Sequence, residues 1–222
     1  MVTRTVRELL IELPELDPDR LVSVDAPWSG HLTDAYVKSG DGLGLRLSGS
    51  RLRRTHLEGL NLAEADWEDV VAEGCVFERI DFSGARLTGL RLDRCHLLGC
   101  KLSRAHLTES ALDNVLFEDC RLDATTLDDV QTAGPVGFTA CVLVNALIRD
   151  CRLDQATFEG CRLREVTLAS CDLRGADLRG NRLAGIRGVT SLRGVVIEPA
   201  QLADLTDAVM RDLDVVVRGP HR

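Results

Sequence analysis

Residues 80–109 read IDFSG ARLTG LRLDR CHLLG CKLSR AHLTE, six blocks of five with leucine or phenylalanine at the third place of each. The same period runs from about residue 45 to residue 185, and a small or modest apolar residue often stands at the first place of a block. A period of five matches neither the turn of an α-helix nor the alternation of a β-strand. The sequence therefore predicts an internal repeat that forms one continuous array.

The blocks resemble the repeats of the pentapeptide-repeat family. In that family a small residue, Asp or Asn, Leu or Phe, and two polar residues recur. The clearest copies here are 60–64 (LNLAE), 80–84 (IDFSG), 171–175 (CDLRG) and 176–180 (ADLRG). The resemblance covers residues 45–185. It implies an all-β solenoid, a right-handed quadrilateral parallel β-helix of about seven coils, in which four blocks form the four sides of each coil.

Four blocks per coil would bring residues that are four blocks apart into one column. Phe77, Phe117, Phe138 and Phe158 then share one column, and Cys100, Cys120, Cys141 and Cys161 share another. Both groupings require one added residue between Thr132 and Phe138. The sequence therefore predicts a register slip near Gly134 and Pro135.

The ends of such a stack would expose unpaired strand edges, which must be covered. Residues 1–44 are expected to form an N-terminal cap segment, irregular over 14–44 and either helical or extended over residues 6–13. Residues 186–222 are expected to form a C-terminal cap with an amphipathic helix at about 199–213. The face of this helix that caps the rod or forms a dimer is predicted to comprise Leu202, Leu205, Val209, Met210 and Leu213.

Composition and cysteine placement exclude several classes of protein. Hydrophobic residues are 45% of the chain, yet no apolar run approaches the roughly 20 residues that cross a bilayer. The first 13 residues carry charges of both signs, unlike a signal peptide, so we expect a soluble, cytoplasmic protein. The eight cysteines all stand at the first place of a block, which indicates buried thiols rather than disulfides or zinc ligands.

The sequence predicts no catalytic, cofactor-binding or metal site. Phosphate-binding loops and the GxSxG and HExxH motifs are missing from it. His56 and His96 fall on one column two coils apart, too far to share a metal ion, and His106 lies on another side. We interpret all three as surface imidazoles and expect a protein that is not an enzyme.

Charged residues are the remaining candidates for function, because the chain carries a net charge of −8. One glutamate row is expected to stack beside the phenylalanine column: Glu58, Glu78, Glu118 and Glu159. An acidic belt is expected at equivalent places on four successive sides: Asp113, Glu118, Asp123 and Asp128. A basic row is expected on the next side: Lys101, Arg121, Arg162 and Arg182. The row and the belt are the predicted partner-binding residues, and the alternative is a solvated surface with weak ion pairs between coils.

Two functions remain open. The first is a non-catalytic protein-interaction module or scaffold that uses a side of the rod. The alternative follows from the resemblance, because one branch of the family mimics DNA and protects DNA gyrase or topoisomerase IV from quinolones or peptide toxins. Such a mimic implies an acidic rod dimerised through its C-terminal end, whereas residues 45–185 hold 18 basic side chains and concentrate their acids in a belt.

The sequence does not identify the binding partner of the protein, except that DNA gyrase is possible for the DNA mimic. Direct nucleic-acid binding is not expected, because the acidic chain lacks the basic footprint that phosphates require. Whether the C-terminal helix forms a homodimer or only caps the rod stays open.

Overall fold

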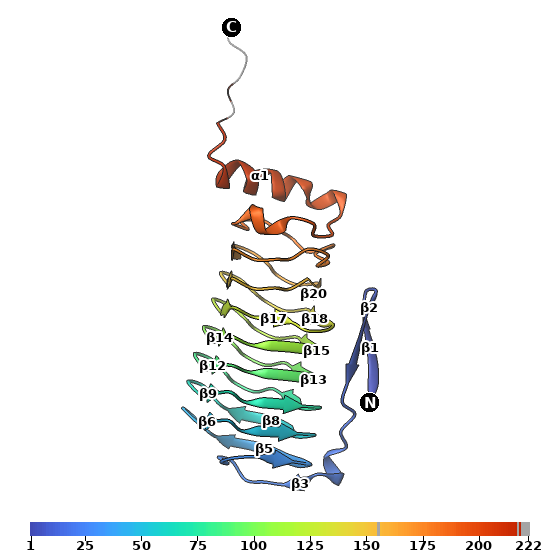
Figure 1. Ribbon diagram of the computed structural model, residues 1–222, viewed down its shortest axis with the longest axis vertical. Helices are drawn as coiled ribbons and strands as arrows, with labels where there is room; N and C mark the ends of the chain where they lie inside the picture. Colours follow the sequence, from blue (N-terminus) through green and yellow to red (C-terminus); the bar gives the residue numbers. More distant parts are fainter. Residues whose placement is uncertain (155, 217, 219–222) are drawn as a thin grey trace.

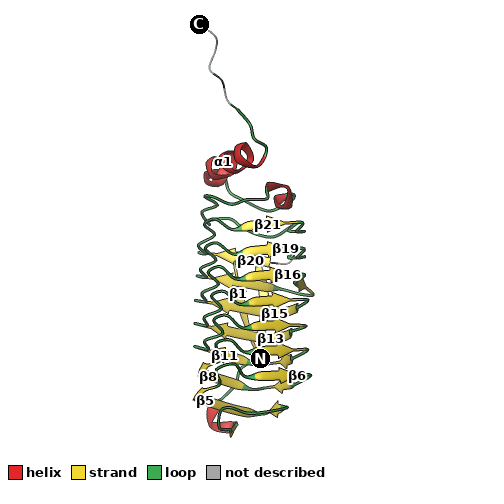
Figure 2. Cartoon of the chain, turned by 90° about the vertical axis from the view of Figure 1, so that its left-hand side faces the viewer, coloured by secondary structure: helices red, strands yellow, loops and turns green. Residues whose placement is uncertain are grey.

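The computed structural model describes residues 1–154, 156–216 and 218. The chain winds into a rod, a parallel β-solenoid of about seven turns, with a short helix across its C-terminal end (Figure 1). Seen from the adjacent side, the coils are stacked layers of short strands joined by turns (Figure 2). The predicted all-β solenoid is confirmed.

The strands line the sides of the rod in long ladders. One ladder consists of β3 (Val22–Ser23), β5 (Ala35–Asp41), β8 (His56–Asn61), β11 (Val76–Glu78), β13 (Arg91–Leu98), β15 (Ala111–Glu118), β18 (Val136–Thr139) and β20 (Ala156–Glu159). We call its outward surface the β8 face. The same sheet continues around a corner of the rod, because β13 and β15 are long enough to pair with strands on two sides. The strands on the second side are β4 (Leu32–Thr33), β7 (Arg51–Arg53), β10 (Val71–Glu73) and β17 (Gln131–Thr132).

A separate seven-stranded sheet lines another side of the rod. It consists of β6 (Arg46–Ser48), β9 (Asp66–Glu68), β12 (Arg86–Thr88), β14 (His106–Thr108), β16 (Thr126–Asp128), β19 (Leu147–Arg149) and β21 (Thr167–Ala169). Its pairs are all parallel and in register, so equivalent positions of successive repeats stack directly on one another.

The register slips once where the sequence predicts it. Ala111 pairs with Gln131, but Val115 pairs with Val136, so one residue is inserted between these two pairs. A Cβ atom on Gly134 would lie 2.0 Å from Oδ1 of Asp113. Glycine at the inserted turn thus leaves room for this carboxylate, which would have to move if residue 134 carried a side chain.

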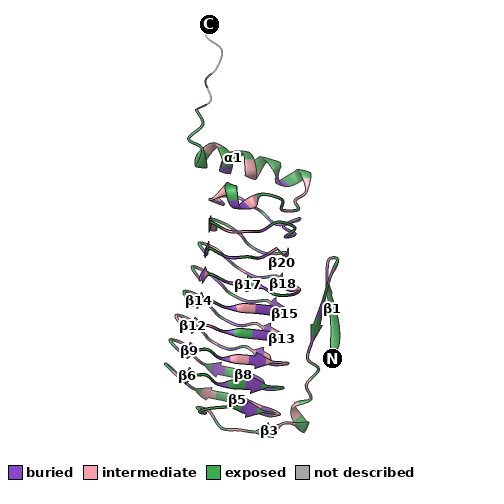
Figure 3. Cartoon of the chain, in the orientation of Figure 1, coloured by how far each residue is buried: buried purple, intermediate pink, exposed green. Residues whose placement is uncertain are grey.

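The leucine, phenylalanine and cysteine columns form the core of the rod (Figure 3). Phe117, Phe138 and Phe158 stack face to face with ring centroids 4.8 and 4.7 Å apart, which matches the spacing of neighbouring strands. All eight cysteines are free thiols, and each is buried except the half-buried Cys171. The thiols donate to backbone carbonyls, as Cys141 does to Phe117 at 3.3 Å, so the expected role as core residues is confirmed.

The N-terminal segment is more regular than the expected cap. β1 (Val2–Val6) and β2 (Leu9–Leu13) form an antiparallel hairpin, which decides the open question in favour of strands. The hairpin lies along the outside of the rod beside β13 and β15 (Figure 1). We call residues 1–13 the strap. The short helix η1 (Pro18–Arg20) follows, and β4 and β5 already pair with β7 and β8, so regular stacking begins before residue 45.

The coils also continue beyond residue 185 at the other end. Asp177 pairs with Val196, which is one residue fewer than the usual interval between coils. The short helices η2 (Val189–Leu192) and η3 (Pro199–Gln201) lead into α1 (Leu202–Asp212), at the place where a helix is predicted. Among the described residues, no helix combines the length and apolarity that crossing a membrane demands.

Polar side chains attach α1 to the last coil. Asp204 accepts a hydrogen bond from the backbone N–H of Leu183 at 2.9 Å, and Asp212 accepts one from Gly188 at 2.6 Å. Gln201 donates to the carbonyl of Asn181 at 2.6 Å. The helix thus binds backbone groups that would otherwise form an open strand edge.

Candidate interaction surfaces

The glutamate row lies on the β8 face, but it is not continuous. Glu58 and Glu78 stand opposite each other in adjacent strands. Leu98 separates Glu78 from Glu118, and Thr139 follows Glu118 in the next coil. The side therefore carries a pair of glutamates and then isolated ones, rather than a stripe of negative charge along the whole rod.

Cations within the chain compensate most of this row. Arg79 binds the carboxylates of both Glu58 and Glu78. Arg4 of the strap binds Glu118, with Nη2 and Oε1 3.0 Å apart. Among the described residues Glu159 has no ion pair, so it is the one member of the row whose charge is left uncompensated.

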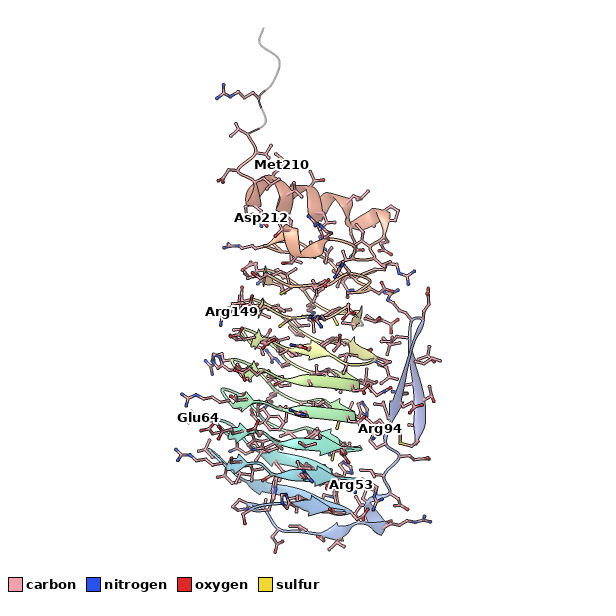
Figure 4. The ribbon with its side chains drawn as sticks, in the orientation of Figure 1. Arg53, Glu64, Arg94, Arg149, Met210 and Asp212 are labelled. Atoms are coloured by element: carbon pink, nitrogen blue, oxygen red, sulfur yellow. The ribbon has the colours of Figure 1, made fainter. Side chains whose placement is uncertain are left out.

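The acidic belt is compensated in the same way. Arg121 pairs with Asp123 at 3.1 Å, and Arg149, which projects from the edge of the rod in Figure 4, pairs with Asp128. The hydrogen bond from Arg149 lowers the pKa of Asp128. Asp113 accepts a hydrogen bond from Nδ2 of Asn114 at 2.9 Å. The belt therefore presents less negative charge to a partner than its count of carboxylates suggests.

The interpretation of His56 and His96 as surface imidazoles is wrong. His56 is only 8% exposed, and its Nε2 lies 3.1 Å from Oε2 of Glu78. His96 is also largely buried, with Nε2 2.9 Å from Oε2 of Glu118, and burial lowers its pKa. Each imidazole reaches the glutamate of the next coil because parallel stacking places both on one face. His106 is exposed, as expected.

The strap covers the C-terminal half of the β8 face. Val6, Ile11 and Leu13 bury Leu116 in an apolar cluster separate from the core of the rod. A Cβ atom on Gly137 would lie 2.8 Å from Cδ1 of Ile11, so the absence of a side chain there makes room for the strap.

Polar contacts hold the tip of the strap further along the rod. Nη2 of Arg7 donates to the carbonyl of Arg179 at 2.7 Å. Arg179 in turn binds Glu8 of the strap and Asp177 of its own repeat. Together with the contact between Arg4 and Glu118, these bonds fix the strap at several levels of the rod, so this part of the β8 face is already occupied.

The outer surface of α1 exposes apolar side chains beside polar ones. Leu205 and the buried Ala208 pack toward the rod, as part of its core cluster. Leu202, Val209 and Leu213 follow one another at intervals of seven and four residues, and they are 56, 38 and 61% exposed. Figure 4 shows Asp212 on the rod side of the helix and Met210 on the far side.

The basic row is only partly paired. Lys101 pairs with Asp81 at 3.4 Å, and Arg121 pairs with Asp123. Arg162 and Arg182 stand opposite each other and form no ion pair with a described residue. They line a shallow groove on the side of the rod next to the β8 face.

Comparisons with known proteins agree with this architecture. Two family models match the chain, both described as pentapeptide repeats: a model of nine copies matches residues 52–96 and a model of eight copies matches residues 141–180. The chain belongs to the pentapeptide-repeat family. No curated protein is similar enough in sequence to match it.

Solved structures of other pentapeptide-repeat proteins resemble this one. A trypsin-treated form of QnrB1, a plasmid-mediated fluoroquinolone resistance protein, superposes with a TM-score of 0.61 at 16% identity, covering 90% of this chain and all of that chain. HetL, a pentapeptide repeat protein involved in heterocyst differentiation regulation from the cyanobacterium Nostoc, gives a TM-score of 0.34 at 20% identity and covers 76% of this chain and 78% of its own. At 16% identity the likeness to QnrB1 concerns the fold alone.

The sequence of this pentapeptide-repeat protein contains indications of the strap and of the histidine–glutamate pairs, although the repeat pattern alone predicts neither. Leu116 is a large apolar residue at an outward position, which indicates a covering element, and residues 9–13 alternate as a strand does. Each of the two buried histidines contacts a glutamate of the next coil, as His56 contacts Glu78. An alignment of the histidines with the residues one coil later would have shown these pairs.

Proposed function

We propose that this protein is a non-catalytic interaction module, which binds proteins with its outer surface and pairs with a second copy through α1. The observation that carries the proposal is the orientation of this helix. Its polar side chains bind the last coil, whereas Leu202, Val209 and Leu213 remain exposed. A helix that only capped the rod would have no need of an outward apolar surface.

A second copy of the chain is the occupant that fits this surface best. The patch lies at the end of the rod, where two copies can meet about a twofold axis without obstruction by the coils (Figure 1). Such a contact is self-complementary, because the same apolar residues come from both sides. Val215 and Val216, which are 47 and 74% exposed, extend the patch beyond the helix.

The interior of the rod supports a non-catalytic role. A void of about 10 Å³ lies among core side chains that include Trp67, Phe77 and Phe82, which is at the lower limit for one water molecule. The larger spaces among the described residues, such as those beside Arg51 and beside Arg162, are open grooves on the outside. The chemistry available to a partner is that of flat, charged surfaces.

Light scattering on matched variants tests the proposed dimer. The double substitution of Val209→Asp and Leu213→Asp is expected to convert dimers to monomers without loss of the rod, because both side chains face outward. Leu10→Asp serves as the control, since Leu10 is 59% exposed but lies on the strap. If the double variant and the control have the same mass as the wild type, α1 does not form the dimer.

Leu205→Asp separates capping from pairing. Leu205 packs against the core of the rod, so a charge there is expected to lower the free energy of unfolding by about 2 kcal/mol. An unchanged unfolding midpoint would show that α1 is not needed as a cap.

A DNA mimic that protects gyrase or topoisomerase IV is the second candidate. Its support is the superposition on QnrB1, a fluoroquinolone resistance protein, over 90% of this chain. Weighing against it are the interrupted glutamate row and the internal ion pairs at Glu58, Glu78 and Glu118. In a gyrase supercoiling assay with added quinolone, the interaction-module proposal expects no protection by the chain. Dose-dependent protection would establish the mimic instead.

A further inference from the structure

A cluster of metal-binding side chains lies on the open half of the β8 face. Parallel stacking puts Glu58 and Glu78 side by side in β8 and β11, with His56 two residues before Glu58 on the same face. One ligand atom from each of the three residues lies within 4.8 Å of the other two. Tyr36 of β5 stands next to His56, with ring centroids 5.2 Å apart.

The two carboxylates are held in a partly desolvated position. The side chains of Glu58 and Glu78 are only 16 and 21% exposed. A nearby cation stabilises the charged forms of neighbouring carboxylates that have little access to water. The structure supplies Arg79, which binds both glutamates, and Lys38 of β5, which stands opposite Glu58.

His56 contributes a buried imidazole to the cluster. The residue is more than nine-tenths buried, and its Nε2 points at Glu78 into the cluster. Its other nitrogen, Nδ1, is buried without a hydrogen-bond partner among the described residues. Nε2 is therefore the nitrogen that can serve as a metal ligand in this cluster, and Glu78 is its present partner.

Arg79 is well placed to be exchanged for a metal ion. Its side chain is 58% exposed and projects from a corner of the coil, where it can turn into solvent. The phenol of Tyr36 would continue to donate to Glu58, a bond that raises the pKa of Tyr36 to about 12 and lowers that of Glu58.

We propose that His56, Glu58 and Glu78 bind a divalent transition-metal ion of the zinc type, with Arg79 occupying the site when the ion is absent. One imidazole nitrogen and two carboxylate oxygens form a three-ligand set that leaves a fourth position open to solvent. The ion would replace the single positive charge of Arg79 between the two glutamates with two positive charges. The inference does not depend on the proposed interaction function.

The next histidine along the same face provides a natural control. His96 also binds the glutamate of the following coil, Glu118, but Leu98 stands where His56 has Glu58 as its neighbour. The pair His96 and Glu118 thus lacks the second carboxylate. Glu78→Gln and Glu118→Gln are therefore matched substitutions, of which only the first removes a ligand of the proposed site.

The test is calorimetric titration of the full chain with Zn²⁺ at neutral pH. The wild type is expected to bind one equivalent, Glu118→Gln to bind like the wild type, and Glu78→Gln to lose about 100-fold or more in affinity. Arg79→Met removes the competing cation and is expected to bind up to about fivefold more tightly, the strength of an exposed ion pair. A purely structural ion-pair cluster predicts no such gain.

Co²⁺ as a second probe distinguishes this site from the cysteine thiols. Nitrogen and oxygen ligands give visible d–d absorption without a thiolate charge-transfer band. A thiolate band, equal binding by Glu78→Gln and the wild type, or no binding by both the wild type and Arg79→Met would each overturn the proposal.

Discussion

The two halves of the β8 face use the same backbone for opposite purposes. Toward the N-terminus the outward positions include the polar residues Tyr36, His56 and Glu58, and the strap contacts the later strands β13, β15 and β18 instead. Toward the C-terminus they include Leu116 and Gly137, and the strap covers them. The repeat fixes which residues point inward, but it leaves the outward positions free, so they are the places where individual functions can arise.

The largest expected difference is in the free energy of unfolding, between a substitution in the core of the rod and removal of the strap. Phe138 stacks between Phe117 and Phe158 in the core, so Phe138→Ala is expected to lower the free energy of unfolding by about 3–5 kcal/mol. Deletion of residues 1–13 removes the separate cluster around Leu116 and the polar contacts of the strap, and is expected to leave the rod folded with a smaller loss. Denaturant unfolding of both variants measures the contrast, and unfolding of the rod after the deletion would contradict it.

The fit of the strap over Gly137 can be broken at one position. Gly137→Leu is expected to detach the strap and lower stability by about 1–3 kcal/mol, because the new side chain occupies the space of Ile11 and Val6. Hydrogen exchange of residues 1–13 reports the release. In a chain that lacks the strap the same substitution should cost much less, and an equal cost in both backgrounds would show that the strap is not the cause.

A smaller expected effect is the change of stability with pH that comes from His96, at the boundary between the two halves of the β8 face. Burial keeps the pKa of His96 below its ordinary value of 6.5, although Glu118 and Glu78 favour the charged form and Arg4 opposes it. The unfolded chain therefore binds more protons than the folded chain as the pH falls through this range, so His96 makes stability decrease toward acid.

The pH dependence of the melting temperature, measured above and below pH 6.5, tests this sign for the wild type and for His96→Gln. The substitution is expected to flatten the decrease. A steeper decrease in the variant would mean that protonated His96 stabilises the fold through Glu118.

The sequence was sufficient for the fold and for the interior. The five-residue period determined the columns, the position of the slip near Gly134 and the core role of the cysteines, because burial admits few residue types at inward positions. The strap was not predicted, because β1 and β2 pair with each other and contact the rod through residues such as Leu116 that are distant in sequence.

The exterior was predicted less well. The acids at Glu58, Glu78, Glu118, Asp123 and Asp128 were recognised, but their partners were not. Long arginine side chains reach across a corner or a coil, as Arg79 does to Glu58. Composition alone does not show with which carboxylate each arginine pairs. The net charge of the chain therefore overstated the charge that these residues offer to a partner.

The mass of the full-length wild type by light scattering, over a range of concentrations, tests the proposed interaction module most directly. The outward apolar surface of α1, with Leu202, Val209 and Leu213 exposed, predicts twice the mass of one chain and a return to the single mass when Val209 and Leu213 are replaced by Asp. A wild type that remains a single chain at every concentration would contradict the account.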